Sequence, residues 1–140
     1  MKTNRYLLLL LSTFFCLRSF AEPGDSLHIP KQEKLYLHTD KPYYLIGDTL
    51  WFKGYLVDMQ THRMQDAESR FIYVELIDRK NKVRYRKKIK RDEYGFSNYR
   101  AITPEFIEGD YQLRAYTNYM RNEGEDFFFT KPITIYNSTA

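Results

Sequence analysis

The feature that most constrains the fold is an alternation of apolar and polar residues, which recurs along the chain from residue 34 onward. Turn-forming residues separate the alternating runs, and no run shows apolar residues at helical spacing. Successive side chains of a β-strand point to opposite faces, so each run predicts a strand with one face toward a core. A series of short strands separated by turns is typical of a β-sandwich. We therefore expect an all-β, seven-stranded, immunoglobulin-like antiparallel β-sandwich.

The seven expected strands share this alternation and end at turn-forming residues. They span residues 34–39, 49–57, 71–78, 82–90, 96–102, 110–118 and 127–136. Four of them have one largely apolar face, and the residues expected to form the core are Leu50, Phe52, Gly54, Leu56, Ile72, Val74, Leu76, Val83, Tyr85, Ile89, Tyr111, Leu113 and Ala115. Gly47 and Asp48 predict the turn before the second strand. Pro42 has no N–H to donate to a ladder, so we expect it in a bend or at a sheet edge.

The N-terminus has the layout of a cleaved secretory signal peptide. Lys2 and Arg5 precede an apolar run over residues 6–17, and Ala21 ends a small-residue site at which cleavage is expected. The first alternative is a membrane anchor, but a spanning helix needs roughly 20 apolar residues and this run is shorter. The second is a lipoprotein acylated at Cys16, although the bulky residues before that cysteine do not suit such processing. We therefore expect an exported protein.

Removal of the signal peptide changes the charge and the thiol content of the chain. The net charge falls from +4 to +1, because three basic residues and no acid precede residue 22. The single cysteine also leaves, so neither a disulfide nor a thiolate metal site is expected. We expect no nucleic-acid partner and no membrane span after cleavage, and a location in the periplasm, at the outer membrane or at the cell surface. The expected division is a signal peptide at 1–21, a flexible leader at 22–33 and a sandwich domain at 34–137.

A basic run over residues 79–91 contains nine lysines and arginines. Alternation places Arg84, Arg86, Lys88 and Lys90 on the outer face of the fourth strand. This face would suit an anionic ligand such as lipopolysaccharide, an anionic glycan or phospholipid headgroups. A solvated charged face that protects a sheet edge from pairing would have the same sequence. The pattern leaves both interpretations open.

Aromatic residues make up 17% of the chain, and several lie on strand faces opposite the expected core. Trp51, Tyr55, Tyr73 and Tyr116 are the main examples. Tryptophan and tyrosine are the residue types that most often anchor interfaces. We predict that these four form a docking surface for a neighbouring domain, a partner protein or a sugar. The alternatives are that loops cover the rings or that the two faces are assigned the wrong way round.

Other conspicuous residues favour structural roles over chemistry. Gly109 and Tyr111 predict a tyrosine corner, in which the hydroxyl bonds to nearby backbone. Asp40 precedes Lys41 and Pro42 and predicts an Asx-type turn. No histidines have metal-ligand spacing, so we expect no metal site. Because nucleophile-elbow, P-loop and glycine-rich phosphate motifs are missing from the sequence, we also expect no enzymatic activity and no cofactor.

Two stretches carry a resemblance to a known family. Residues 34–58 contain Thr-Asp-Lys-Pro, an aromatic residue, a Gly-Asp turn and then Phe-Lys on a strand, and residues 109–116 read Gly-Asp-Tyr-Gln-Leu-Arg-Ala-Tyr. Together they resemble an N-terminal domain of the alpha-2-macroglobulin family. Residues 117–129 are similar, more narrowly, to a bacterial cell-envelope branch. Longer proteins of that branch can carry a plug domain like that of TonB-dependent receptors.

The resemblance extends from residue 34 to about residue 136. It implies a macroglobulin-type sandwich and, by ancestry, a link to endopeptidase inhibition. The sequence thus predicts a non-enzymatic binding or structural module of the bacterial cell envelope, whose partner is another envelope protein or a neighbouring domain. Two alternatives remain open. One is a module that binds a glycan or a protease, and the other is an inactive fragment of a longer TonB-associated protein.

Overall fold

The computed structural model describes residues 31–138. The predicted signal peptide, the alternative lipidation at Cys16 and most of the expected leader lie outside the described residues. In chain order the elements are β1 (Glu33–Thr39), β2 (Tyr43–Leu45), β3 (Thr49–Asp58), β4 (Phe71–Asp78), β5 (Val83–Lys90), β6 (Phe96–Ala101), β7 (Gly109–Tyr116), α2 (Asn118–Glu123), a 3₁₀ turn at Glu125–Phe127 and β8 (Phe129–Tyr136).

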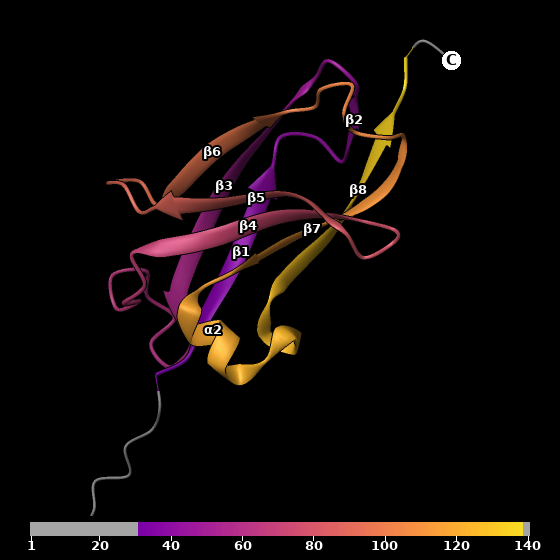
Figure 1. The fold of residues 1–140 in the computed structure, drawn as a ribbon. Coiled ribbons are helices and arrows are strands. Elements are labelled where there is room, and N and C mark those ends of the chain that lie inside the picture. Colours follow the sequence, from indigo (N-terminus) through magenta and orange to yellow (C-terminus); the bar gives the residue numbers. More distant parts are fainter. Residues whose placement is uncertain (1–30, 139–140) are drawn as a thin grey trace, which may run out of the picture. The chain divides into compact units, whose positions relative to one another are not determined.

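The strands form two sheets that pack into a sandwich (Figure 1). One sheet has three strands in the order β1-β3-β6, and both of its pairs are antiparallel. The other has five strands in the order β2-β8-β7-β4-β5. Its pairs are antiparallel except for β2 with β8, which run parallel. The expected all-β sandwich is confirmed.

The core lies between the sheets and draws on the predicted inward faces. On β3, Leu50, Phe52 and Leu56 are buried, as expected from the alternation. Gly54 lies in close contact with the facing sheet: a Cβ at this position would lie 3.1 Å from the side chain of Ile72 on β4. Any larger residue would have to displace this side chain and those of Leu37 and Phe96 on the neighbouring strands. The absence of a side chain at position 54 therefore permits the close packing.

Residues 31–138 form eight strands where seven were expected. The additional strand is β2, which has only three residues and is too short to show an alternating pattern. Its central residue, Tyr44, is fully buried, while Pro42 lies in a bend immediately before the strand. β2 forms one edge of the five-stranded sheet, which suits a segment that follows a proline. The expectation of a purely antiparallel sandwich is wrong at this edge.

A short helix and a 3₁₀ turn separate the last two strands, where the sequence showed no helical spacing. β7 ends at Tyr116, and Thr117 caps α2 by accepting a hydrogen bond from the backbone N–H of Met120 at 3.3 Å. A helix of six residues is too short to show a periodic apolar face. The expected strand at 110–118 therefore ends early, and the last strand starts at Phe129.

The first strand begins at Glu33, a residue that was assigned to the flexible leader. Its carboxylate is buried and accepts hydrogen bonds from the backbone N–H groups of Glu68 and Ser69, at 2.9 and 2.8 Å. The hydroxyl of Thr117 also donates to it, at 2.8 Å. These bonds join β1 to the loop before β4 and to the start of α2. A buried carboxylate needs hydrogen-bond donors, and the folded domain supplies all of those named here. Glu33 is therefore part of the folded domain and not of a flexible leader.

Two residues that were assigned to the core are only partly buried. Val83 and Tyr85 lie on β5, which forms the other edge of the five-stranded sheet. The pairing of β4 with β5 is also irregular between Leu76 and Ile77. An edge strand has a neighbour on one side alone, so its inward residues receive less cover than those of β3 or β7.

Candidate functional site

The outer face of the three-stranded sheet carries four exposed aromatic residues, which we call the aromatic face: Tyr36, Trp51, Tyr55 and Tyr99. Strand register brings them together, because Tyr36 pairs with Tyr55 and Trp51 pairs with Tyr99 across neighbouring strands. Trp51 and Tyr99 are each 54% exposed, and their ring centroids lie 4.8 Å apart. The Tyr36 ring lies edge-on against Phe129 of β8, with centroids 5.3 Å apart. The two pairs lie on one face with the polar row of His38, Lys53 and Ser97 between them, and exposed apolar surface of this kind marks an interaction site.

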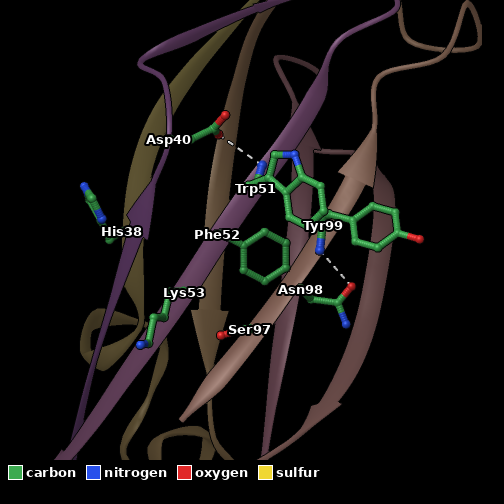
Figure 2. Close-up of a pocket in the computed structure, with 8 residues that line it drawn as sticks. All are labelled: His38, Asp40, Trp51, Phe52, Lys53, Ser97, Asn98 and Tyr99. Carbon is green, nitrogen blue, oxygen red and sulfur yellow. Dashed lines mark hydrogen bonds between the residues drawn. The ribbon is translucent and has the colours of Figure 1, made fainter. Parts of the chain in front are cut away.

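A shallow hollow of about 500 Å³ lies beside the Trp51 and Tyr99 rings (Figure 2). Polar side chains surround it: His38, Asp40, Lys53, Ser97 and Asn98. They come from β1, β3, β6 and the bend after β1, so the hollow depends on the pairing of the three strands. An apolar centre with a polar rim is the arrangement found in protein interfaces.

Asp40 holds the edge of this hollow in place. Its Oδ1 atom accepts hydrogen bonds from the backbone N–H of Trp51 at 3.0 Å and from the hydroxyl of Tyr44 at 2.6 Å. Its own N–H donates to the Trp51 carbonyl at 3.2 Å. Burial and the bond to Asp40 raise the pKa of Tyr44 above its ordinary range. The hydroxyl therefore stays protonated and acts as a donor.

The predicted Asx-type turn at Asp40 is wrong. Such a turn needs an N–H two residues later, and that residue is Pro42, which has none. The carboxylate instead reaches across to β3. The neighbouring Gly47 and Asp48 do form a turn: Gly47 has φ of 102°, and the Asp48 carboxylate accepts from the backbone N–H of Leu45 at 3.1 Å.

The four aromatic residues predicted to share one docking surface lie on two different sheets. Trp51 and Tyr55 lie on β3, whereas Tyr73 and Tyr116 lie on β4 and β7 of the five-stranded sheet. Tyr116 is also buried, because its ring stacks on those of Tyr73 and Phe128. The ring centroids are 5.4 Å apart for Tyr73 and 4.3 Å apart for Phe128. The prediction that Tyr116 forms part of an exposed interface is therefore wrong, and Tyr73 is half-buried beside it.

Sequence reasoning missed Tyr36 and Tyr99, which complete the aromatic face. The signal was present for Tyr36, since it alternates with the buried Leu35 and Leu37 on β1. Tyr99 lies two residues from Ser97 on β6, a strand whose outward residues are otherwise small or polar. Only the register of β3 with β6 places it against Trp51.

The four basic residues of β5 that were expected to bind an anion are exposed, as their alternation predicts, but two of them are ion-paired. Arg84 donates to Asp78 at 2.7 Å, and Arg86 donates to Glu75 at 2.6 Å. Lys88 lies over the ring of Phe71, with Nζ 4.2 Å from the centroid. Lys90 has no ion pair with any residue that the structure describes. The expected anion-binding face thus carries less free charge than the sequence shows.

Tyr111 has the bonding pattern of a tyrosine corner. Its hydroxyl donates to the carbonyl of Ile107 at 2.8 Å and accepts from the N–H of the same residue at 3.1 Å. Gly109 has φ of 138°, which favours glycine at the entry to β7. Nearby Asp110 is paired with Arg79, so this end of β7 is held by structural contacts.

Residues 31–138 include no group of three or more histidine, cysteine, aspartate or glutamate side chains that could hold a metal ion. Within the same range, no helix is both long and apolar enough to cross a membrane.

The sandwich has a macroglobulin-type fold, as comparison with solved structures shows. No protein-family model matches the sequence, and no curated protein matches it significantly. Solved structures do match the fold of this chain. A Salmonella alpha-2-macroglobulin reacted with methylamine superposes with a TM-score of 0.60 at 13% identity, over 76% of this chain and 6% of that one. A trypsin-activated alpha-2-macroglobulin from Escherichia coli superposes with a TM-score of 0.59 at 14% identity. The match covers 74% of this chain and 6% of that one.

The native conformation of the E. coli protein gives a TM-score of 0.58 at 13% identity. At such low identity these matches show the fold alone. The chain spans about 6% of the length of these proteins, in which the matched region is a small part of a long polypeptide.

Proposed function

We propose that this chain is a non-enzymatic module of the bacterial cell envelope that binds a partner protein, or a neighbouring domain, through its aromatic face. The observation that carries the proposal is the exposed pair of Trp51 and Tyr99 beside a polar-rimmed hollow. Export and an envelope location are part of the proposal and are supported by the N-terminal sequence and by the family resemblance.

The shape of the aromatic face favours a protein partner. The aromatic face spans three strands, and its hollow is open and shallow, whereas small-molecule sites enclose most of their ligand. Tryptophan and tyrosine supply a large contact area at low entropic cost, which suits them to anchor an interface. Lys53, with Nζ 5.5 Å from the ring centroid of Tyr55, adds a charge at the centre of the face. The surface would therefore prefer a partner with an acidic side chain flanked by apolar ones.

Site-specific photo-cross-linking in the producing bacterium tests this proposal. The variant Tyr36→p-benzoylphenylalanine places the reactive group at the rim of the aromatic face and leaves Trp51 and Tyr99 intact. We expect one adduct of defined mass with a second protein. Adding Trp51→Ala should reduce the yield by about tenfold, as expected for an interface anchor.

The matched control carries the same reactive group at Ile107, which is 65% exposed in the loop before β7. It should give no such adduct. Equal adducts from both positions, or none from position 36, would contradict the proposal. An adduct of two copies of this chain would identify self-association, and a glycosidase-sensitive adduct would identify a glycan ligand; either would replace the proposed partner.

A further inference from the structure

A second hollow, of about 350 Å³, lies on the outer face of the five-stranded sheet, beside α2 and the 3₁₀ turn. Three arginines from three different elements line it: Arg86 from β5, Arg114 from β7 and Arg121 from α2. The stacked rings of Tyr73, Tyr116 and Phe128 form its apolar lining. We call this hollow the arginine pocket. It is separate from the aromatic face, which lies on the other sheet.

A buried carboxylate fixes two of the arginines. Glu75 has no exposed side-chain surface, and Arg86 Nε donates to it at 2.6 Å. Arg114 donates to it from Nε at 2.9 Å and from a terminal nitrogen at 2.8 Å. Because these bonds use mainly one edge of each guanidinium, terminal N–H groups remain available to a ligand. A guanidinium held in this way loses little further freedom on binding.

The charges of the pocket are incompletely balanced. Arg121 has no ion pair with any residue in the described part of the chain. Glu125 approaches Arg114 at 3.3 Å, but its side chain is 77% exposed, so the contact is easily broken. With Glu125 in contact, the three arginines and two carboxylates give the pocket a net charge of +1. Without Glu125, the three arginines and Glu75 give a net charge of +2. A dianion would match the second state.

We propose that the arginine pocket binds the phosphate group of a small phosphorylated sugar, which displaces Glu125 from Arg114. A phosphate monoester carries close to two negative charges and offers three acceptor oxygens to the guanidinium groups. The hollow is at the size at which small-ligand sites begin, and Tyr73 and Phe128, the two outer rings of the stack, offer apolar contact to a sugar ring. Lys88 and Lys90 on the adjacent edge strand add a positive field that attracts an anion.

Calorimetric titration of the purified protein with inorganic phosphate and with glucose 6-phosphate tests the proposal. We expect saturable binding of both, with glucose 6-phosphate the tighter ligand. Arg121→Gln should weaken the binding of glucose 6-phosphate by about tenfold, because the loss of one charge-assisted hydrogen bond lowers the affinity by about that factor. Glu125→Gln should strengthen it by about threefold, because the displaced competitor is gone.

Two control variants make the same charge changes away from the pocket contacts. Arg63→Gln alters an exposed arginine in the loop before β4, and Asp126→Asn alters an exposed acid beside Glu125. Both should leave the affinity nearly unchanged. Absence of saturable binding, equal affinity for the two ligands, or an effect of the controls as large as that of Arg121→Gln and Glu125→Gln would overturn the proposal. Thermal melts of all four variants should match the wild type, which separates loss of binding from loss of folding.

Discussion

At the scale of single residues, Glu75 is a fully buried carboxylate with three side-chain partners. Its carboxylate is buried on the outer side of the five-stranded sheet, beneath Arg86, Arg114 and Tyr116. Burial alone would raise the pKa of Glu75, but the hydrogen bonds from Arg114, Tyr116 and Arg86 outweigh it and hold that pKa below its ordinary value of 4.5. The residue is therefore ionised in the folded protein at neutral pH.

This shift makes part of the folding stability depend on pH. A carboxyl group with a lower pKa in the folded state stabilises the protein above its unfolded pKa, and the effect is lost as the pH falls through the folded pKa. We expect Glu75→Gln to cost about 3 kcal/mol in the free energy of unfolding at pH 7, since it leaves two arginines without their counter-charge. The difference from the wild type should shrink progressively below about pH 4.5.

Urea unfolding at a series of pH values measures this difference. Glu93→Gln removes an exposed carboxylate in the turn after β5 and serves as the control, with an expected change close to zero. A loss at Glu75→Gln that stayed constant between pH 7 and pH 3 would show that the charge of Glu75 does not carry the stabilisation.

At the scale of elements, the tyrosine corner governs how the chain enters β7. Tyr111 is buried, and its hydroxyl makes both of its bonds to Ile107 in the connection from β6. Because β6 and β7 belong to different sheets, this connection crosses the sandwich, and the hydroxyl fixes its last turn. The ring also packs edge-on against Phe106, with centroids 5.9 Å apart.

Tyr111→Phe should therefore lower the free energy of unfolding by about 1 kcal/mol, because the ring stays packed and the hydroxyl bonds are lost. Chemical denaturation measures the change. Tyr94→Phe, at a ring that is 70% exposed in the β5–β6 turn, is the matched control and should have no effect. Equal stability of Tyr111→Phe and the wild type would mean that water replaces the two bonds without cost.

Strands and short connections differ in how far they can be anticipated from local sequence. β1, β3 and β4 carry enough alternating residues to reveal their faces, and their predicted positions agree closely with the structure. β2 and α2 have three and six residues, which is below the length at which a period can be recognised. They form because β8 offers an edge to β2 and because Thr117 caps α2.

At the scale of the whole molecule, the sandwich separates two surfaces of different chemistry. The outer face of the three-stranded sheet is aromatic and exposed at Trp51 and Tyr99. The outer face of the five-stranded sheet carries arginines over a buried carboxylate. Since one core stabilises both sheets, we expect neither surface to persist if the other sheet unfolds.

A two-probe unfolding experiment tests this dependence. Trp51 is the only tryptophan and lies on the three-stranded sheet, while far-ultraviolet circular dichroism reports on both sheets. Urea transitions followed by fluorescence and by dichroism should have the same midpoint, as expected for one cooperative unit. A fluorescence transition at lower urea than the dichroism transition would show that the three-stranded sheet unfolds first. The two sheets would then not form one cooperative unit.

Local patterns in the sequence predicted the core-facing residues of β3 and β7 but not those of the edge strand β5, because a strand's period of two gives the direction of a side chain and not the cover it receives. They also predicted the turn at Gly47 and Asp48, where the residue types themselves favour the backbone shape. The same patterns placed Trp51 and Tyr116 together, since both point away from the core sets. Period two does not say to which sheet a strand belongs, and the tertiary structure assigned these residues to different sheets.

The polar contacts between distant parts of the chain were decided by the tertiary structure alone. Glu75 meets Arg114, 39 residues later in the chain, because β4 pairs with β7, and Asp40 meets the backbone of Trp51 because β1 pairs with β3. From sequence alone, a carboxylate on a strand is predicted to be exposed to solvent, because its distant hydrogen-bond donors are unknown. The physical reason is that burial of a charge depends on partners supplied by other strands, whereas the direction of a side chain depends on its own backbone.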